Sequence, residues 1–172
     1  AEADDIIGTL VPRHILMEDV LILSSDGDFL QLQRYNTGKF KVKQYNPSQK
    51  KYVVSQNPDK ELKEKIIRGD KGDGIPNIIS PGDTFVRDLR QKVLTEAKFN
   101  KLMNEDHTQY DENAKHGFAR NQVLIDLTNI PADIQTKIIN NYNETKPVGR
   151  GKLINYFIEH KLKNLMDVIE EF

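Results

Sequence analysis

Seven carboxylate side chains gather in three short stretches of the sequence, each near the end of a predicted element. They are Glu2, Asp4 and Asp5, then Asp26 and Asp28, and finally Asp70 and Asp73. Carboxylates held close together repel one another, so such a cluster favours a bound cation. Oxygen ligands without histidine or cysteine select hard ions, Mg²⁺ or Mn²⁺. Several carboxylates around such ions indicate phosphoryl chemistry with two metal ions.

Other kinds of site are excluded or disfavoured by the sequence. The chain has no cysteine, which excludes disulfides, zinc–thiolate sites and thiol catalysis, and its four histidines are scattered. Residues 26–30 offer neither the ligand spacing nor the terminal glutamate of an EF-hand. A phosphatase of the haloacid dehalogenase type usually follows its Asp-x-Asp with threonine or valine, where this chain has Leu30.

Two of the three acidic groups also have a structural explanation. Glu2, Asp4 and Asp5 fall in the first turn of a predicted helix, where the helix dipole favours negative charge. Asp70 and Asp73 lie in a glycine-rich stretch, which taken alone is better explained by a helix C-cap followed by a surface turn. The metal hypothesis therefore depends on the groups coming together.

The strand that carries the second acidic group organises the first part of the chain. Residues 20–23 (VLIL) predict a short, fully buried strand of a parallel sheet, and open α/β sheets build their sites at the carboxyl ends of such strands. Residues 1–10 predict a helix that stops near Pro12, and a short helix follows the aspartates through residue 32. Residues 39–45 alternate as a half-buried strand does, and residues 50–54 could be its hairpin partner.

From residue 58 onwards the pattern is helical, and we place a domain boundary there, with an α/β domain over 1–58 and a helical domain over 59–172. Helices are predicted from an N-cap at Asp59 to Arg68, over 84–103, from Pro131 to 142, and over 153–172 as one helix or a pair. Residues 146–152 are predicted to form a basic loop. The apolar run 123–125 is too short to assign.

The charges are unevenly distributed, although the formal net charge is −1. Residues 1–28 carry seven acids and one arginine, whereas residues 31–71 carry eleven basic residues and four acids. An acidic cluster beside a basic stretch suggests a metal site next to a nucleic-acid backbone. An ordinary lysine-rich, solvated face would give the same count, and charge alone favours that explanation.

Three motifs in order resemble those of the 5′-nuclease (flap endonuclease) superfamily. They are residues 2–5 (EADD), residues 24–32 (SSDGDFLQL) and residues 69–76 (GDKGDGIP). Two later segments, residues 121–127 (NQVLIDL) and 151–157 (GKLINYF), make the chain most similar to the ribonuclease H family of T-even-like bacteriophages. The resemblance covers nearly the whole chain and is weakest over residues 78–120.

The resemblance implies part of a parallel-sheet, PIN-like nuclease domain, followed by an α-helical domain with a helix–turn–helix-like duplex-binding motif. It implies a Mg²⁺-dependent 5′-to-3′ exonuclease and flap endonuclease that removes RNA primers in DNA replication. By motif position, Glu2, Asp4 and Asp5 would serve the first metal ion, and Asp26 would lie near both. Asp28, Asp70 and Asp73 would serve the second. Glu2, Asp4 and Asp26 are the expected catalytic residues, and the expected nucleic-acid contacts are Lys63, Arg68, Lys71 and Gly74.

The chain departs from that family in two ways. Family members carry further metal-binding aspartates upstream of the first motif, so we expect a C-terminal fragment that is inactive alone. Residues 77–82 also lack the glycine-rich pattern with which many relatives hold potassium.

The expected partners and location follow from the same resemblance. The substrates would be DNA and RNA–DNA duplexes with 5′ ends or flaps, and the protein would be a monomer in the cytoplasm of the host cell. A single-strand-binding protein and a sliding clamp of the phage are candidate partners, and no run is apolar enough for a membrane. The alternative is a non-catalytic nucleic-acid-binding fragment that retains the carboxylates as relics.

Overall fold

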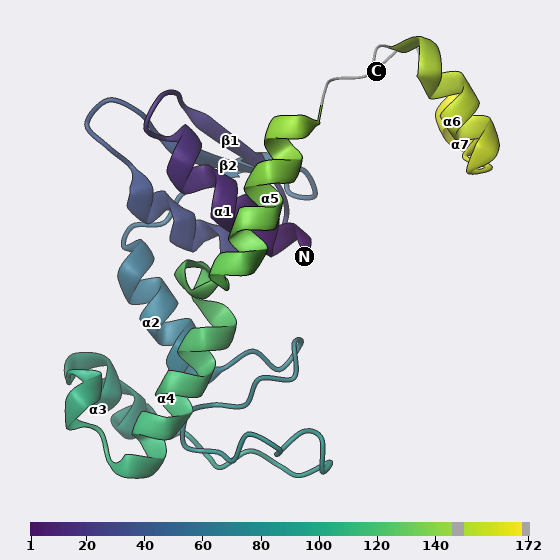
Figure 1. The fold of residues 1–172 in the computed structure, drawn as a ribbon. Helices are drawn as coiled ribbons and strands as arrows, with labels where there is room; N and C mark the ends of the chain where they lie inside the picture. Colours follow the sequence, from purple (N-terminus) through teal and green to yellow (C-terminus); the bar gives the residue numbers. More distant parts are fainter. Residues whose placement is uncertain (146–149, 170–172) are drawn as a thin grey trace. The chain divides into compact units, whose positions relative to one another are not determined.

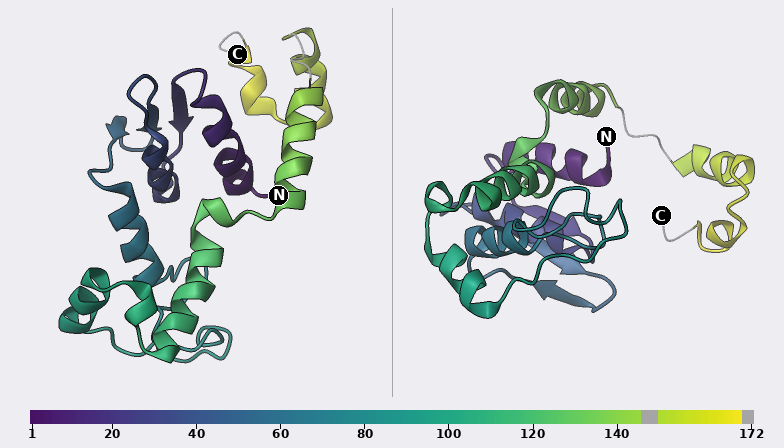
Figure 2. Two further views of the ribbon diagram at one scale, coloured as in Figure 1. Left: turned by 60° about the vertical axis from the view of Figure 1, so that its left-hand side comes forward. Right: turned by 90° about the horizontal axis from the view of Figure 1, so that it is seen from below.

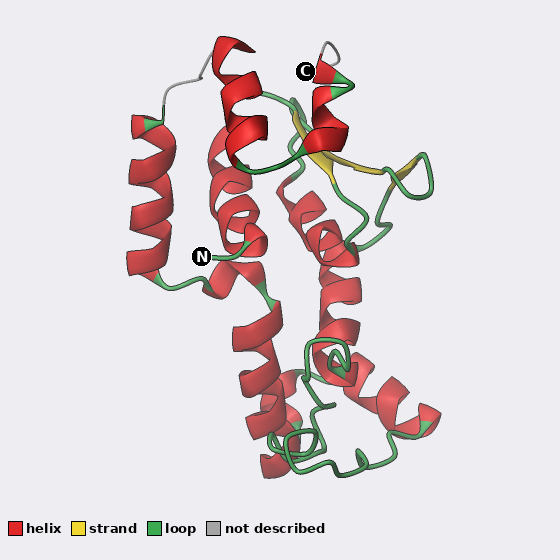
Figure 3. Ribbon diagram, turned by 90° about the vertical axis from the view of Figure 1, so that its right-hand side faces the viewer, coloured by secondary structure: helices red, strands yellow, loops and turns green. Residues whose placement is uncertain are grey.

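The computed structural model describes residues 1–145 and 150–169. These residues belong to two compact units, Ala1–Ile139 and Asn140–Phe172. Helices, strands and loops are distinguished in Figure 3. The basic loop expected over 146–152 lies mostly outside the described residues. Among the described residues, no helix is both long and apolar enough to cross a membrane.

A small mixed sheet forms from three strands, β1 (Val20–Leu23), β2 (Val42–Asn46) and β3 (Lys51–Val53). Strand β1 pairs with β2 in parallel, with Val20 opposite Val42, and β3 runs antiparallel to β2. This confirms the parallel strand and the hairpin. The order β1-β2-β3 leaves β1 at one edge of the described sheet.

The prediction that the first strand is fully buried is wrong. Only Ile22 of β1 is buried, whereas the side chains of Leu21 and Leu23 are 57% and 68% exposed. Successive side chains of a strand point to opposite faces, and in the described part of the chain only the face of Ile22 is covered. The unbroken apolar run therefore does not mean burial on both faces here.

Ile22 packs on a core formed by helix α1 (Ala3–His14) and the 3₁₀ helix η1 (Gly27–Tyr35). The buried members of this first core are Val11, Ile15, Ile22, Phe29, Leu32 and Val42. Helix α1 continues past Pro12, contrary to our prediction. A proline within a helix loses one backbone hydrogen bond. Burial of Val11 and Ile15 on either side of it favours continuing the helix.

Helices α2 (Pro58–Arg68) and α4 (Glu112–Ile125) lie side by side below the sheet (Figure 1), with α3 (Glu96–Asn104) packed against α2. They enclose a second core, which includes Ile66, Ile67, Phe99 and Phe118. The helix predicted to end at Arg68 is confirmed. Its N-cap is Asn57, whose side chain accepts a hydrogen bond from the Lys60 amide, rather than Asp59, because Pro58 occupies the first helical position.

Residues 84–95, predicted to be helical, form turns and extended chain, and the helix begins only at Glu96. Side chains take the place of helical hydrogen bonds in this segment. Asn77 donates to the Lys92 carbonyl at 3.0 Å, and the Lys92 amide donates to Ser80 at 2.9 Å. The apolar periodicity misled the prediction, because Val93 is 82% exposed and packs on neither core.

The unassigned run 123–125 forms the end of α4. A short 3₁₀ helix precedes α4 in the sequence, η2 (His107–Gln109), and another follows it, η3 (Leu127–Asn129). Helix α5 (Ala132–Glu144) follows Pro131 as predicted. In the second unit, η4 (Arg150–Lys152), α6 (Leu153–Glu159) and α7 (Lys163–Met166) agree with the expected helix pair, except that residues 170–172 lie outside the described residues. Figure 2 gives two further views of these elements.

The boundary that we placed at residue 58 falls inside the first compact unit. The two cores lie mainly on either side of it in sequence, although Leu127 packs on the first. The division therefore stays a prediction.

Helix α4 approaches the chain after the glycine-rich turn so closely that one position admits only glycine. A Cβ atom added at Gly117 would lie 1.9 Å from the Ile78 carbonyl oxygen. Backbone atoms can yield only if the helix or the turn moves.

We expect Gly117→Ala to destabilise the protein by roughly 1–3 kcal/mol, because the overlap outweighs the gain of about 1 kcal/mol that alanine brings to a helix. Urea unfolding followed by circular dichroism measures the difference. Gly38→Ala is the control, since no atom lies within 4 Å of its added Cβ. Equal stability of the two variants would contradict the close approach.

Candidate metal-binding site

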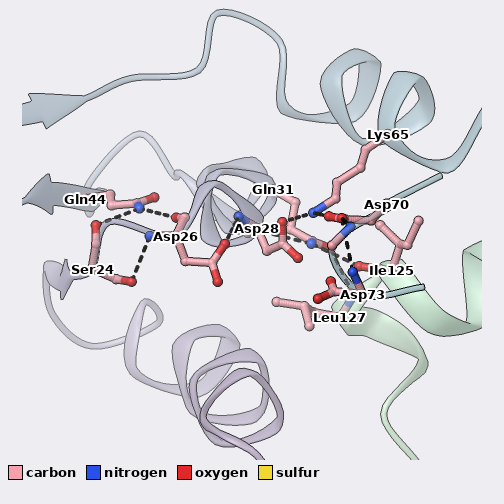
Figure 4. Close-up of polar contacts among 11 residues, drawn as sticks. Ser24, Asp26, Asp28, Gln31, Gln44, Lys65, Asp70, Asp73, Ile125 and Leu127 are labelled. Carbon is pink, nitrogen blue, oxygen red and sulfur yellow. Dashed lines mark hydrogen bonds and ion pairs between the residues drawn. The ribbon is translucent and has the colours of Figure 1, made fainter. Parts of the chain in front are cut away.

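The turn after β1 is held in shape by short polar contacts. Asp26 caps η1, because its carboxylate accepts a hydrogen bond from the Asp28 amide at 2.9 Å. The Asp26 amide donates to the Ser24 hydroxyl at 3.1 Å. The buried Gln44 side chain donates to the carbonyls of Ser24 and Asp26 from the neighbouring strand (Figure 4). These contacts fix the position of Asp28 relative to the end of β1.

The second turn follows α2 and is closed by its own backbone. Gly69 has φ +72°, a conformation that favours glycine, and the Ile75 amide donates to the Asp70 carbonyl at 2.7 Å. The Asp70 carboxylate accepts from the Gly72 amide at 2.8 Å.

Helix α4 holds this turn from outside through two polar side chains. The fully buried Asn121 donates to the carbonyls of Ile66 and Pro76, both at 2.8 Å. The Arg120 guanidinium donates to the carbonyls of Pro76, Asn77 and Ser80. Both ends of the turn are therefore tied to one helix.

The two turns bring Asp28, Asp70 and Asp73 together. One carboxylate oxygen from each lies within 4.8 Å of the other two, and we call these three residues the acidic triad. Asp28 and Asp70 are partly buried and Asp73 is exposed, so the triad is open to solvent on the side of Asp73. Carboxylate oxygens at this spacing suit a hard divalent cation.

Lys65 of α2 reaches into the triad. Its ammonium group pairs with Asp28 and lies 2.9 Å from Asp70 (Figure 4). Burial alone would lower the pKa of Lys65, but hydrogen bonds to the two carboxylates outweigh it and raise that pKa. Lys65 therefore stays protonated and places a positive charge beside Asp28 and Asp70.

The two carboxylates that pair with Lys65 respond differently to their surroundings. Burial raises the pKa of Asp28, and the lysine offsets this only in part. The hydrogen bond from Lys65 lowers the pKa of the more open Asp70. The triad thus combines one carboxylate that is costly to ionise with one that ionises readily.

Gln31 connects the acidic end of η1 to the far end of α4. Its amide nitrogen donates to the carbonyls of Asp28 at 2.9 Å and Ile125 at 3.1 Å, and its oxygen accepts from the Leu127 amide at 2.9 Å (Figure 4). The side chain is buried. This one amide therefore bridges η1 and the end of α4.

Glu2, Asp4 and Asp5 stand at the start of α1. Glu2 is the N-cap, and the carboxylate of Asp5 in the first turn accepts a hydrogen bond from the Glu2 amide at 2.8 Å, as in a capping box. Burial raises the pKa of Asp4, and the charges of Asp26, Asp28, Glu2 and Asp5 raise it further. The charges of the second acidic group thus act on Asp4. Among the described residues, however, the triad is the only set of carboxylates spaced to hold a metal ion.

The expected nucleic-acid contacts have different surroundings. Lys63 donates to the carbonyls of Met103 at 2.9 Å and Glu105 at 2.7 Å, at the end of α3. Arg68 is half-exposed, bonds Glu64 and stacks on Phe99, 3.7 Å from the ring centroid. Lys71 and Gly74 are exposed in the turn, and Gly74 has φ +73°.

Sequence reasoning missed Lys65 and Gln31. Lys65 is one of several lysines in α2, and only the direction in which it projects sets it apart from Lys60 or Lys63. Gln31 could have been found from the sequence, because a polar residue inside the apolar run of residues 29–32 needs a buried hydrogen-bond partner.

Comparison with known proteins identifies the chain's relatives. A family model described as T4 RNase H, C terminal, matches residues 56–172. Ribonuclease H of Enterobacteria phage T4 is 34% identical over 180 aligned positions, which cover 99% of this chain and 58% of the relative. The chain thus spans somewhat more than half the length of that relative.

These matches place the chain in a nuclease family. In particular, it belongs to the T4 RNase H family, which confirms the resemblance seen in the sequence motifs.

We expect Gln31→Leu to lower the free energy of unfolding by about 2–3 kcal/mol, because it leaves the buried Ile125 carbonyl and the partly buried Leu127 amide without their partner. Thermal or urea unfolding provides the measurement. Gln49→Leu, at an exposed position, controls for the added apolar surface. A Gln31→Leu variant as stable as its control would show that Gln31 does not hold the two parts together.

Proposed function

We propose that the chain is part of a divalent-metal-dependent 5′-nuclease that hydrolyses phosphodiester bonds in DNA and RNA–DNA duplexes with 5′ ends or flaps. In replication it would remove RNA primers. The observation that carries the proposal is the acidic triad, which joins two sequence motifs 42 residues apart in a chain of the T4 RNase H family.

The donor set fits the proposed Mg²⁺, with Mn²⁺ as an alternative, because it consists of carboxylate oxygens within 4.8 Å of one another. Asp28, Asp70 and Asp73 would hold one ion, and Glu2, Asp4 and Asp5 would serve a second. When bound, two such ions neutralise the phosphate and lower the pKa of an attacking water.

Asp26 is the residue that we place between the two groups. Its carboxylate is exposed and already fixed by the Asp28 amide, so it has a second oxygen free to face an ion. Its charge also reaches Asp4, whose pKa it raises. Glu2, Asp4 and Asp26 would together orient the water that attacks the phosphate.

The alternative proposal is a nucleic-acid-binding protein with relic carboxylates. The pairing of Lys65 with Asp28 and Asp70 favours it, because an internal cation can hold carboxylates together without a metal. The two proposals are distinguished by comparing a site variant with the parent protein. A nuclease loses cleavage in the variant and retains duplex binding, whereas a protein with relic carboxylates cleaves in neither form.

Asp26→Asn in the intact gene product should reduce Mg²⁺-dependent cleavage of a 5′-flap or RNA–DNA duplex by at least about 100-fold, because a ligand charge at the reacting centre is lost. Asp133→Asn, at an exposed position on α5, should cleave like the parent. The two-metal assignment is wrong if Asp26→Asn retains full activity. Absence of cleavage by both the parent and Asp133→Asn would favour the relic proposal.

We also propose that the helical part of the chain binds the duplex, with a helix–turn–helix-like arrangement that includes α2 and the turn after it. Lys71 supports this, because it is exposed beside the triad and forms no ion pair within the described residues. Arg68 and Gly74 lie on the same stretch, where Gly74 would let a phosphate approach the backbone. Lys63 is engaged with α3 and would contribute least. The protein would act as a cytoplasmic monomer in the host, beside phage replication proteins.

Lys71→Ala should weaken duplex binding about uniformly across sequences and reduce the slope of log K against log salt by about one, as expected for a lost phosphate contact. Fluorescence anisotropy at several salt concentrations measures both quantities. Lys98→Ala removes an exposed lysine on α3 and should change neither. An unaltered slope for Lys71→Ala would show that Lys71 is an ordinary solvated lysine that contacts no phosphate.

A further inference from the structure

Lys65 holds two of the three carboxylates that the proposed metal site needs. Its ammonium group pairs with Asp28 and lies 2.9 Å from Asp70, and no more than 27% of any of the three side chains is exposed. Ion pairs on the open surface are worth little, but partial burial weakens screening by water and salt. The lysine therefore contributes substantially to the electrostatics of the triad.

The charges of the triad and Lys65 do not balance. Three carboxylates and one ammonium group leave a formal charge of −2, so the triad still attracts a cation. An ion bound between Asp28 and Asp70 would lie within a few ångströms of the ammonium group, and two positive charges so close repel. Coordination and the lysine pairing therefore oppose each other.

We propose that Lys65 is an internal counter-ion that competes with the divalent ion for Asp28 and Asp70 and so sets the metal affinity of the site. Without metal, it relieves the repulsion between the carboxylates and stabilises the fold. When metal binds, the lysine releases them, and its flexible chain lets the charge turn towards solvent. This inference rests on the proposed metal site, but it concerns binding and requires no cleavage.

The competing explanation gives Lys65 the opposite effect. If the lysine mainly holds Asp28 and Asp70 in the positions that an ion needs, its removal disorders the site and weakens metal binding. The sign of the change in affinity therefore decides between competition and support.

The test measures Mn²⁺ binding to the protein without nucleic acid, by loss of the paramagnetic resonance signal of the free ion. Lys65→Met keeps the length and apolar stem of the side chain and removes its charge. We expect it to bind Mn²⁺ about tenfold more tightly than the parent protein. It should also unfold at a lower temperature in EDTA and gain more thermal stability from Mn²⁺.

Two further variants complete the comparison, and a third serves as a substitute. Lys60→Met removes an exposed lysine from the same helix and should bind Mn²⁺ like the parent. Lys65→Arg keeps the charge and should stay within about threefold of the parent affinity. Lys65→Gln replaces Lys65→Met if the latter does not fold.

Weaker or unchanged Mn²⁺ binding in the neutral variants would overturn the inference, as would an equal gain in Lys60→Met. Absence of binding in every variant would overturn it too, because Lys65 would then not limit affinity. A failure of the nuclease proposal appears separately, as an intact protein that binds the ion but cleaves nothing.

Discussion

Repulsion among carboxylates is the constraint around which the rest of this structure is arranged. Asp28, Asp70 and Asp73 come from two different turns, and each gains by moving away from the others. The charge of Lys65 relieves part of that repulsion, and the scaffold must resist what remains. The buried amides that tie η1 and the second turn to α4, together with the close approach of α4 at Gly117, provide that resistance.

Neutral amides make most of the connections that hold the site. Gln31, Gln44 and Asn121 are all buried, and each donates to two backbone carbonyls that belong to different residues. A buried amide is costly unless it is hydrogen-bonded, but it adds no charge to a site already rich in charge. Because these amides are neutral, the carboxylates and Lys65 supply the charge at the site itself, while the Arg120 guanidinium holds the turn from the side of α4.

Local elements could be predicted from the sequence, whereas exposure and cross-chain contacts could not. The apolar run of residues 20–23 predicted the parallel strand, and the spacing of apolar residues predicted the helix that ends at Arg68. Both patterns depend only on residues that are neighbours in the sequence. Burial of β1 and the helix over residues 84–95 were predicted wrongly, because both depend on what covers a side chain. The structure brings together Asp28, Asp70 and Asp73, which the motifs had grouped, but their metal binding stays a prediction. The reach of Lys65 depends on the orientation of α2, which spacing does not encode. The nucleic-acid contacts stay predictions.

The open edge of the sheet has a practical consequence for anyone handling the protein. Strand β1 has a hydrogen-bonding partner on one side only within the described sheet, and its exposed residues include Leu21 and Leu23. No charged residue, proline or bulge interrupts positions 20–23. Natural sheets use such features to prevent strand-to-strand association. This chain should therefore self-associate more as its concentration rises, and Leu21→Lys or Leu23→Lys should reduce that association without altering the acidic triad.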